Sequence, residues 1–459
     1  MEYWLNQFAG FMWGTPLIVL LIGGGVFFVV YSRALPYRHF GHALGILSGR
    51  YDKASDPGTL SHFQALSTAL SGTLGLGNIA GVALAITMGG PGAVFWMWLT
   101  ALLGVATKFF TATLAVMYRG HDSLGQLQGG PMYVVREGLG KRWRFLAVFF
   151  AIAGMCGTLP IFQVNQLVAM LRESVAYPLN LATSEAHVGF DLTAGVLIAL
   201  IVFAVISGNL PRVGKVTARV VPVMVAGYLL MTAGVLITHA GEIPAALMLI
   251  VRDAFTGEAA AGGALGTVIM IGIRRGAFSN EAGIGTESMA HGAARTSEPV
   301  REGLVAMIGP VIDTLIVCTC TALVILVTGV WQAGADTDGI ALTASAFATA
   351  YGTPGHTLLG VMVVFLSLST VLTFWYYGAK CLGFLAGAQH QHHYVWIYCL
   401  LILVGSVASL QAVIGFLDGM YAAMAIPTML SALLLAPRVT QAARQYFSRL
   451  AEIKRAAKQ

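Results

Sequence analysis

An apolar segment that glycines interrupt at its centre constrains this chain more than any other feature. Residues 63–98 are long and apolar enough to enter a bilayer, yet Gly72, Gly75 and Gly77 lie in the middle beside polar side chains. Broken backbone at membrane depth is tolerated only where protein buries it or where it lines a polar cavity. The half-helix ends at such a break present N–H and C=O groups that suit a small zwitterion and a cation. The segment therefore predicts half of a transport site.

Composition places the chain in a membrane. It is 57% hydrophobic and 10% charged, whereas soluble domains carry about 25% charged residues. We therefore expect a polytopic membrane protein. The formal charge of +6 does not predict a nucleic-acid partner, because the basic residues are dispersed at the ends of apolar segments. Residues 14–32 lack the basic start and the cleavage site of a signal peptide, so they are interpreted as a first span.

The cysteines do not predict a metal centre, and the chain does not predict an enzyme. All five cysteines lie in apolar stretches, which favours buried thiols over disulfides. The Cys318-x-Cys320 pair has no histidine nearby and makes a poor metal site. The patterns HExxH and GxSxG and a paired-carboxylate constellation are missing from the chain, so we do not expect an enzyme.

The apolar segments predict an all-α protein with eleven transmembrane helices. Each segment approaches the roughly 20 residues that a bilayer crossing requires. Shorter amphipathic pieces near 36–49, 131–140 and 340–351 are expected at the interface or over a vestibule. The expected spans are about 14–32, 63–87, 91–117, 145–170, 192–208, 213–239, 263–290, 302–329, 355–378, 394–411 and 413–436.

The loop charges give the expected orientation. Alternate loops, starting after the first span, carry 24 of the 26 lysines and arginines, and the other loops carry only Arg172 and Arg252. The positive-inside rule then places the N-terminus outside and the C-terminus in the cytoplasm. Because one miscounted span would scramble this alternation, it supports both the number and the order of the spans.

A second interrupted span predicts an internal repeat. Residues 263–290 break around Arg274–Gly285, again with glycines and polar residues. Interrupted helices in corresponding places indicate an inverted repeat and an occluded site, which argues against an open channel. The expected arrangement is the LeuT-type 5+5 fold preceded by one extra helix. The units are an N-terminal helix and amphipathic segment (1–60), two five-helix repeats (61–240 and 241–437) and a basic tail (438–459).

Several motifs resemble the alanine/glycine:cation symporter family, also called the sodium:alanine symporter family. They include GTLGLGNIAG (72–81), GGPGAVFWMWLTALLG (89–104), RRGAFSNEAGIGTE (274–287) and STVLTFWYYGAKC (369–381). The resemblance implies a LeuT-like fold and Na+-coupled uptake of a small neutral amino acid such as alanine or glycine. It also implies a plasma membrane, of the bacterial inner-membrane kind.

Two residues depart from the pattern of that family. Thr111 stands where we expect a glutamate, and Glu287 stands where many members carry a small residue. Both departures bear on the coupling ion and on the substrate. Proton coupling therefore stays open, as does another neutral amino acid such as serine or glutamine.

A zwitterionic substrate needs groups for its carboxylate, groups for its amine and a limit on its size. We expect the backbone from Thr73 to Gly77 to provide N–H groups, and Gln163 to contact the substrate from the fourth span. Phe278, inside the second break, is expected to cover the substrate. Helix packing through glycines, interhelical hydrogen bonding and core packing are the structural alternatives. The predicted substrate residues are Thr73, Gly75, Gly77, Asn78, Gln163, Phe278 and Asn280, with Ser279 as a further candidate.

The LeuT-like resemblance also implies a sodium site. In such folds, one sodium lies between the first broken helix and a Ser/Thr pair on the eighth core helix. The matching groups are the Ser71 and Leu74 carbonyls with the Ser369 and Thr370 side chains. The structural alternative is that these hydroxyls bond only their own helix.

Acids at membrane depth are functional hypotheses by default. Asp313 is predicted to bind a cation or to pair with a basic gate residue. Glu281 is predicted to pair with Arg274 or Arg275 as a cytoplasmic gate. For each acid, a purely structural pairing is the alternative.

Overall fold

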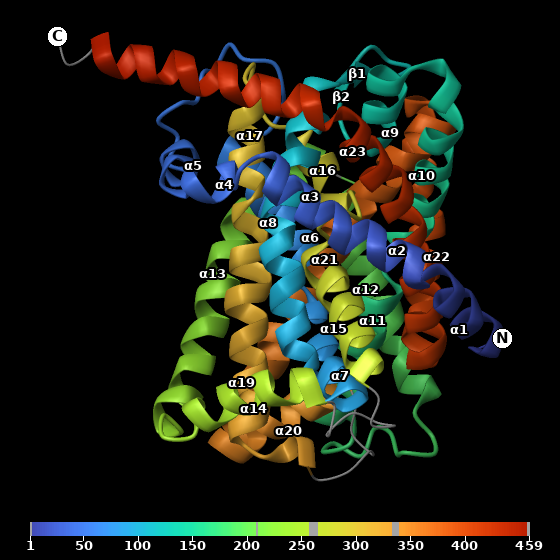
Figure 1. Ribbon diagram of the computed structural model, residues 1–459. Helices are drawn as coiled ribbons and strands as arrows, with labels where there is room; N and C mark the ends of the chain where they lie inside the picture. The colour runs from blue at the N-terminus through green and yellow to red at the C-terminus, as the bar shows by residue number, and fades with distance from the viewer. Residues whose placement is uncertain (1, 208–209, 257–264, 333–338, 457–459) are drawn as a thin grey trace.

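The computed structural model describes residues 2–207, 210–256, 265–332 and 339–456. It is a bundle of helices (Figure 1), as the composition predicted. One detail differs from the all-α expectation. Two two-residue strands, β1 (Gly120–His121) and β2 (Leu127–Gln128), pair antiparallel in the loop after α8.

Seven helices within the described residues are long and apolar enough to cross a membrane, or nine if each of two bent pairs counts as one span. Two further predicted spans correspond to α15 with α16, and to α22 (Tyr394–Val407), which are short for a crossing. The seven are α8 (Ala93–Met117), the run Lys141–Ala176, α12 (Val188–Ile206), α13 (Leu210–Thr238), the run Pro299–Val327, α21 (Thr353–Ala386) and α23 (Leu410–Ala456).

The two ends of the bundle differ, and we call them upper and lower as they are drawn in Figure 1. The upper end holds α5, α17, β1, β2 and the C-terminal part of α23, and the lower end holds α14 and α20. The first predicted span, about 14–32, corresponds to α2 (Thr15–Ile18), η1 (Val19–Gly23) and α3 (Gly24–Tyr31). A further helix, α1 (Glu2–Met12), precedes it at a bend of 47°, and together they cross the front of the bundle obliquely.

Both predicted breaks are present. The first separates α6 (His62–Thr73) from η2 (Leu76–Asn78) and α7 (Ala80–Gly89), and the two halves are bent by 58°. The second separates α15 (Leu265–Asn280) from α16 (Thr286–His291). There Gly283 and Gly285 have φ of +85° and +101°, a left-handed conformation that glycine adopts without steric cost. Residues 263–264 of the predicted span lie outside the described residues.

Close backbone contact fixes α15 against α8. Gly272 and Gly276 have the G-x-x-x-G spacing of tightly packed membrane helices. A Cβ added at Gly272 would lie 2.4 Å from the Ala93 carbonyl oxygen, and one at Gly276 would lie 3.0 Å from the Met97 Cα. The second interrupted helix is therefore held directly on a continuous one.

The remaining elements connect and cover the spans. The three predicted amphipathic pieces coincide with α4 and α5, with α9 and η3, and with α20. Helix α14 had no counterpart in the predicted elements. Their bounds are α4 (Leu35–Arg38), α5 (Phe40–Leu47), α9 (Pro131–Tyr133), η3 (Val134–Leu139), η4 (Lys141–Trp143), α10 (Arg144–Gly157), α11 (Ile161–Leu171), η5 (Arg172–Ala176), α14 (Ile243–Thr256), α17 (Pro299–Ala306), α18 (Ile308–Pro310), η6 (Val311–Cys318), α19 (Thr319–Val327), η7 (Val330–Gln332), α20 (Ile340–Tyr351) and η8 (Ala388–His393).

Candidate functional site

The first break is held open by a side chain from another helix. The Leu76 N–H donates to Oε1 of Gln163 on α11 at 3.1 Å. A Cβ added at Gly75 would lie 2.5 Å from the Thr370 hydroxyl and 3.2 Å from Gln163 Oε1. The glycine therefore lets α6, α11 and α21 approach the same point. Gln163 and Gly75, which were predicted as substrate residues on separate grounds, are thus neighbours in the structure.

Polar groups are left available at this break. Helix α7 begins without a side-chain cap on its N–H groups, and such a helix end favours an anionic group. Within the described residues, the Thr73 hydroxyl and Asn78 Oδ1 are buried and have no hydrogen-bond partner. Because buried polar groups are normally paired, these atoms are candidates to contact a ligand.

Aromatic rings close one side of the break. Ring atoms of Phe278 on α15 lie 3.6 Å from the position that a Cβ at Gly77 would take. The Phe278 ring packs against Phe162 and Tyr421, with ring centroids 5.5 and 5.0 Å apart. The residues of the first break thus face the predicted aromatic cover, although they are some 200 positions distant in the sequence.

Oxygen atoms converge between α6 and α21. The Thr370 hydroxyl lies 2.9 Å from the Ser71 carbonyl oxygen and 3.0 Å from that of Leu366. A hydroxyl has one proton, so it cannot satisfy both carbonyls at once. Hydroxyl and carbonyl oxygens are the ligands that a hard monovalent cation prefers. The geometry therefore suits the predicted cation site.

The other predicted cation ligands surround this point. The Ser71 hydroxyl donates to the Ser369 carbonyl at 2.9 Å, while the Ser369 hydroxyl faces Leu366 and Met224. Leu74 lines a cavity of about 10 Å³ together with Gly75 and Leu366. Sequence reasoning did not select Leu366, whose carbonyl accepts from Ser369 and Thr370 at 3.0 Å each.

Asp313 joins the two breaks. Its side chain is buried and accepts from Asn78 Nδ2 of the first break and from Ser279 Oγ of the second, the latter at 2.9 Å. The Thr314 hydroxyl adds a third donor at 2.7 Å. Asp313 lies in the π-helical segment η6, a kind of irregularity that is frequent at functional sites. A carboxylate held by neutral donors can accept a cation or a proton.

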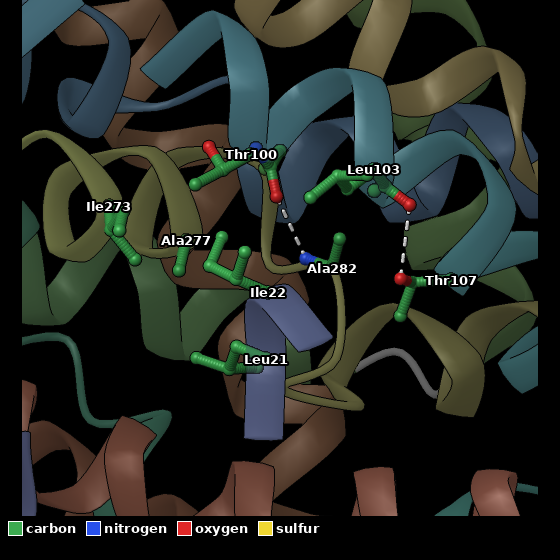
Figure 2. A pocket seen from close by; sticks show the side chains of 10 residues that line it. Leu21, Ile22, Thr100, Leu103, Thr107, Ile273, Ala277 and Ala282 are labelled. Carbon is green, nitrogen blue, oxygen red and sulfur yellow. Dashed lines mark hydrogen bonds between the residues drawn. The ribbon is translucent and has the colours of Figure 1, made fainter. Parts of the chain in front are cut away.

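Asn280 is directed away from the first break. Its amide accepts from the Ala282 N–H at 3.0 Å and lies near the Thr314 hydroxyl. Asn280 also lines a cavity of about 20 Å³ with Leu21 and Ile22 of the first span and Thr100 of α8 (Figure 2). Its side chain therefore bonds the free backbone of the second break, and within the described residues no hydrogen bond joins it to the first break, where most of the other predicted substrate residues lie.

The predicted pairing of Glu281 with Arg274 or Arg275 is wrong. Both arginines bind the buried carboxylate of Asp418 on α23 instead. Glu281 accepts from Thr286 and, at 3.0 Å, from Tyr421. Since α15 enters the bundle from the lower end (Figure 1), the arginine–aspartate cluster lies below the second break. Asp418 falls within the predicted span 413–436, so an acid at membrane depth was the signal available for it.

The two residues that depart from the family pattern contact each other. The Thr111 hydroxyl donates to Oε1 of Glu287 at 3.3 Å, and Oε2 has no partner within the described residues. A carboxylate therefore lies between α8 and α16. It belongs to Glu287 on α16, and not to position 111 on α8, where the family pattern led us to expect a glutamate.

Comparisons with known proteins show the family and the fold of the chain. A model of the sodium:alanine symporter family matches residues 1–459. The sodium/alanine symporter AgcS of Methanococcus maripaludis is 38% identical over 435 residues, covering 94% of each chain. The probable sodium/glutamine symporter GlnT of Bacillus subtilis is 33% identical, over 95% of this chain and 88% of its own. The crystal structure of MhsT with L-phenylalanine shares the fold, with a TM-score of 0.56 at 13% identity, over 84% of this chain and 98% of its own.

Proposed function

Because the chain belongs to the sodium:alanine symporter family, and is a secondary transporter rather than an enzyme, we propose that it takes up a small neutral amino acid together with sodium. Alanine and glycine are the proposed substrates. The proposal rests above all on one observation: groups suited to an amino acid and groups suited to a cation adjoin at the same break, at Gly75 and Thr370.

In the proposed amino-acid site, the substrate carboxylate binds N–H groups between Thr73 and Asn78, with Gln163 holding the break in shape. The uncapped start of α7 supports this placement. The Thr73 hydroxyl and Asn78 Oδ1 are free to contact the substrate. Phe278 closes over it beside Gly77, and its packing against Phe162 and Tyr421 favours a small side chain.

In the proposed sodium site, the cation displaces the hydrogen bonds of Thr370. Its ligands are the Thr370 hydroxyl, the Ser71, Leu74 and Leu366 carbonyls and the Ser369 hydroxyl. Because Ser71 and Leu74 belong to the break that also binds the substrate, sodium binding would order that backbone. This is how one ligand favours binding of the other.

We further propose eleven spans arranged as two inverted five-span repeats, 61–240 and 241–437, in a plasma membrane. The N-terminus would lie outside, and the upper end of the bundle would face the cytoplasm. Transport would proceed by alternating access. The cluster of Arg274, Arg275 and Asp418 would close the outer side.

The test is uptake of labelled alanine into proteoliposomes under inward Na+, K+ or H+ gradients. We expect accumulation with the Na+ gradient alone and competition by glycine. Preferential competition by glutamine would replace the proposed substrate, and no accumulation of any neutral amino acid would contradict the function.

Variants separate the two parts of the site. We expect Gln163→Ala and Thr370→Ala to abolish uptake without loss of membrane insertion. Thr357→Ala is the control for the second, because Thr357 is an exposed residue of the same helix and its hydroxyl bonds only the Thr353 carbonyl among the described residues. Wild-type rates in Gln163→Ala and Thr370→Ala would remove these residues from the site.

Proton coupling is the second candidate, and Asp313 favours it. The carboxylate is buried between both breaks and accepts hydrogen bonds from the neutral side chains of Asn78, Ser279 and Thr314. Under proton coupling, Asp313→Asn would abolish accumulation driven by a pH gradient while exchange of labelled alanine persists. Under sodium coupling through Thr370, a pH gradient alone would drive no accumulation in the wild type.

A further inference from the structure

A buried carboxylate at the upper end joins both interrupted spans to a third helix. Glu302 on α17 accepts from Nδ1 of His62 with one oxygen and from Nδ1 of His291 with the other, the latter at 2.6 Å. His62 is the first residue of α6, and His291 is the last residue of α16. All three side chains are buried, with at most 1% exposed. No residue of this triad contributes to the site proposed above.

A second set of contacts, made by Arg119, joins the loops next to α6 and α16. Arg119, in the loop after α8, donates to the carbonyls of Gly292, Ala294 and Thr296 after α16, and to Pro57 before α6. Burial lowers the pKa of Arg119 to about 10, which leaves it charged at neutral pH. The loops that continue α6 and α16 are therefore bound to one guanidinium.

The triad has features of a contact that is made and broken. Both Nε2 atoms, of His62 and His291, are buried without a hydrogen-bond partner within the described residues. Each histidine thus depends on Glu302 for the hydrogen bonds it makes. Asp52, the other acid near the triad, lies 3.9 Å from His62 Nε2 and is 39% exposed. A purely structural core would use apolar side chains at lower cost.

We propose that Glu302 is a positioning residue that holds the upper halves of both interrupted spans in the closed position. Release of His62 and His291 from Glu302 is then the step that opens the upper end. This inference rests on the proposed alternating access, and it names the contact that separates one state from the other. Because one carboxylate holds both halves, α6 and α16 would open together.

The experiment measures opening without measuring transport. Thr68 is fully buried on α6 and contacts Thr217 on α13, so a cysteine at position 68 reports separation of these helices. The rate of its reaction with a small maleimide is measured in membranes. The labelling of the native cysteines, measured without Thr68→Cys, is subtracted.

We expect Glu302→Gln to raise the labelling rate at position 68 at least about tenfold, since hydrogen bonds to a charged group stabilise by about 1.5–3 kcal/mol. Glu298→Gln is the matched control. Glu298 precedes the same helix, but it pairs with Arg449 at the surface. A rate within twofold of wild type in Glu302→Gln would overturn the proposal.

A second reporter separates opening from general loosening. Ala83 is fully buried on α7, the lower half of the same span. Glu302→Gln should leave the labelling of Ala83→Cys unchanged. Equal increases at both positions would mean that Glu302 only stabilises the fold, and they would overturn the proposal. Since the readout needs neither sodium nor alanine, its result is independent of the proposed substrate and ion.

Discussion

At the scale of the residue, function depends on which polar atoms have no partner. Most buried polar groups are hydrogen-bonded, whereas the Thr73 hydroxyl and Asn78 Oδ1 are not. Both lie at the first break. Thr370 shows the opposite situation: its hydroxyl, which has a single proton, lies within hydrogen-bond distance of two carbonyl oxygens. Unpaired groups and competing groups thus occur where an amino acid and a cation are proposed to bind.

Gly75→Ala tests how closely the site is packed. The added Cβ would meet the Thr370 hydroxyl and the Gln163 amide. We expect uptake to fall at least about tenfold, because overpacking a tight contact costs about 1–3 kcal/mol. Gly81→Ala on α7 is the control, since nothing lies within 4 Å of its Cβ position. Equal uptake by the two variants would mean that the contacts at Gly75 are not part of the site.

At the scale of the element, each interrupted helix is placed by contacts that continuous helices provide. Gly272 and Gly276 bring α15 against α8, and Asp418 binds two arginines of α15 to α23. The main anchors of the second interrupted helix thus lie away from the break itself.

Gly272→Ala should weaken the contact between α15 and α8. Its Cβ would meet backbone, the Ala93 carbonyl, which cannot rotate away as a side chain can. We expect a loss of about 1–3 kcal/mol, seen as a lower apparent melting temperature in detergent. Gly266→Ala, on the same helix and with open space around it, should leave that temperature unchanged. The packing argument fails if both variants melt alike.

The arginine–aspartate cluster predicts an asymmetry between its partners. Asp418→Asn leaves two arginines without their counter-ion and should cost about 3–5 kcal/mol. Arg274→Gln should cost less, because Asp418 keeps Arg275 and because Arg274 is 20% exposed. Apparent melting temperatures of the two variants provide the comparison. A larger loss in Arg274→Gln would mean that Asp418 has other support.

At the scale of the whole molecule, buried charged clusters lie on either side of the second break. Arg274, Arg275 and Asp418 join α15 to α23 below it, and the Glu302 triad joins α6, α16 and α17 at the upper end. The second interrupted span takes part in both clusters, through α15 and α16, and the first takes part in the upper one through His62. Under the proposed alternating access, release of the upper cluster would open that end while the lower cluster stays paired.

The proposed orientation can be checked with two exposed positions. Ser123→Cys lies between β1 and β2 at the upper end, and Thr238→Cys ends α13 near the lower end. A membrane-impermeant maleimide should label position 238 in intact cells and position 123 only after permeabilisation. The opposite pattern would invert the topology.

The sequence alone determined the features that a bilayer dictates locally. Apolar length located the spans, since every backbone group in lipid must be bonded within its own helix. Glycine clusters located both breaks, because only glycine adopts the conformations of Gly283 and Gly285 without strain. The same local signals selected Gln163 and Phe278 as candidates, the polar and the aromatic exception within apolar stretches, whereas the resemblance to LeuT-like folds selected Thr370.

Tertiary structure decided which of these residues meet. Arg274 and Arg275 bind Asp418 rather than the nearby Glu281, because helix rotation, not sequence distance, directs a side chain. Asn280 and Ser279 are adjacent in the chain, yet they face different neighbours for the same reason. The triad of His62, His291 and Glu302 joins three helices whose relative depth no local pattern specifies.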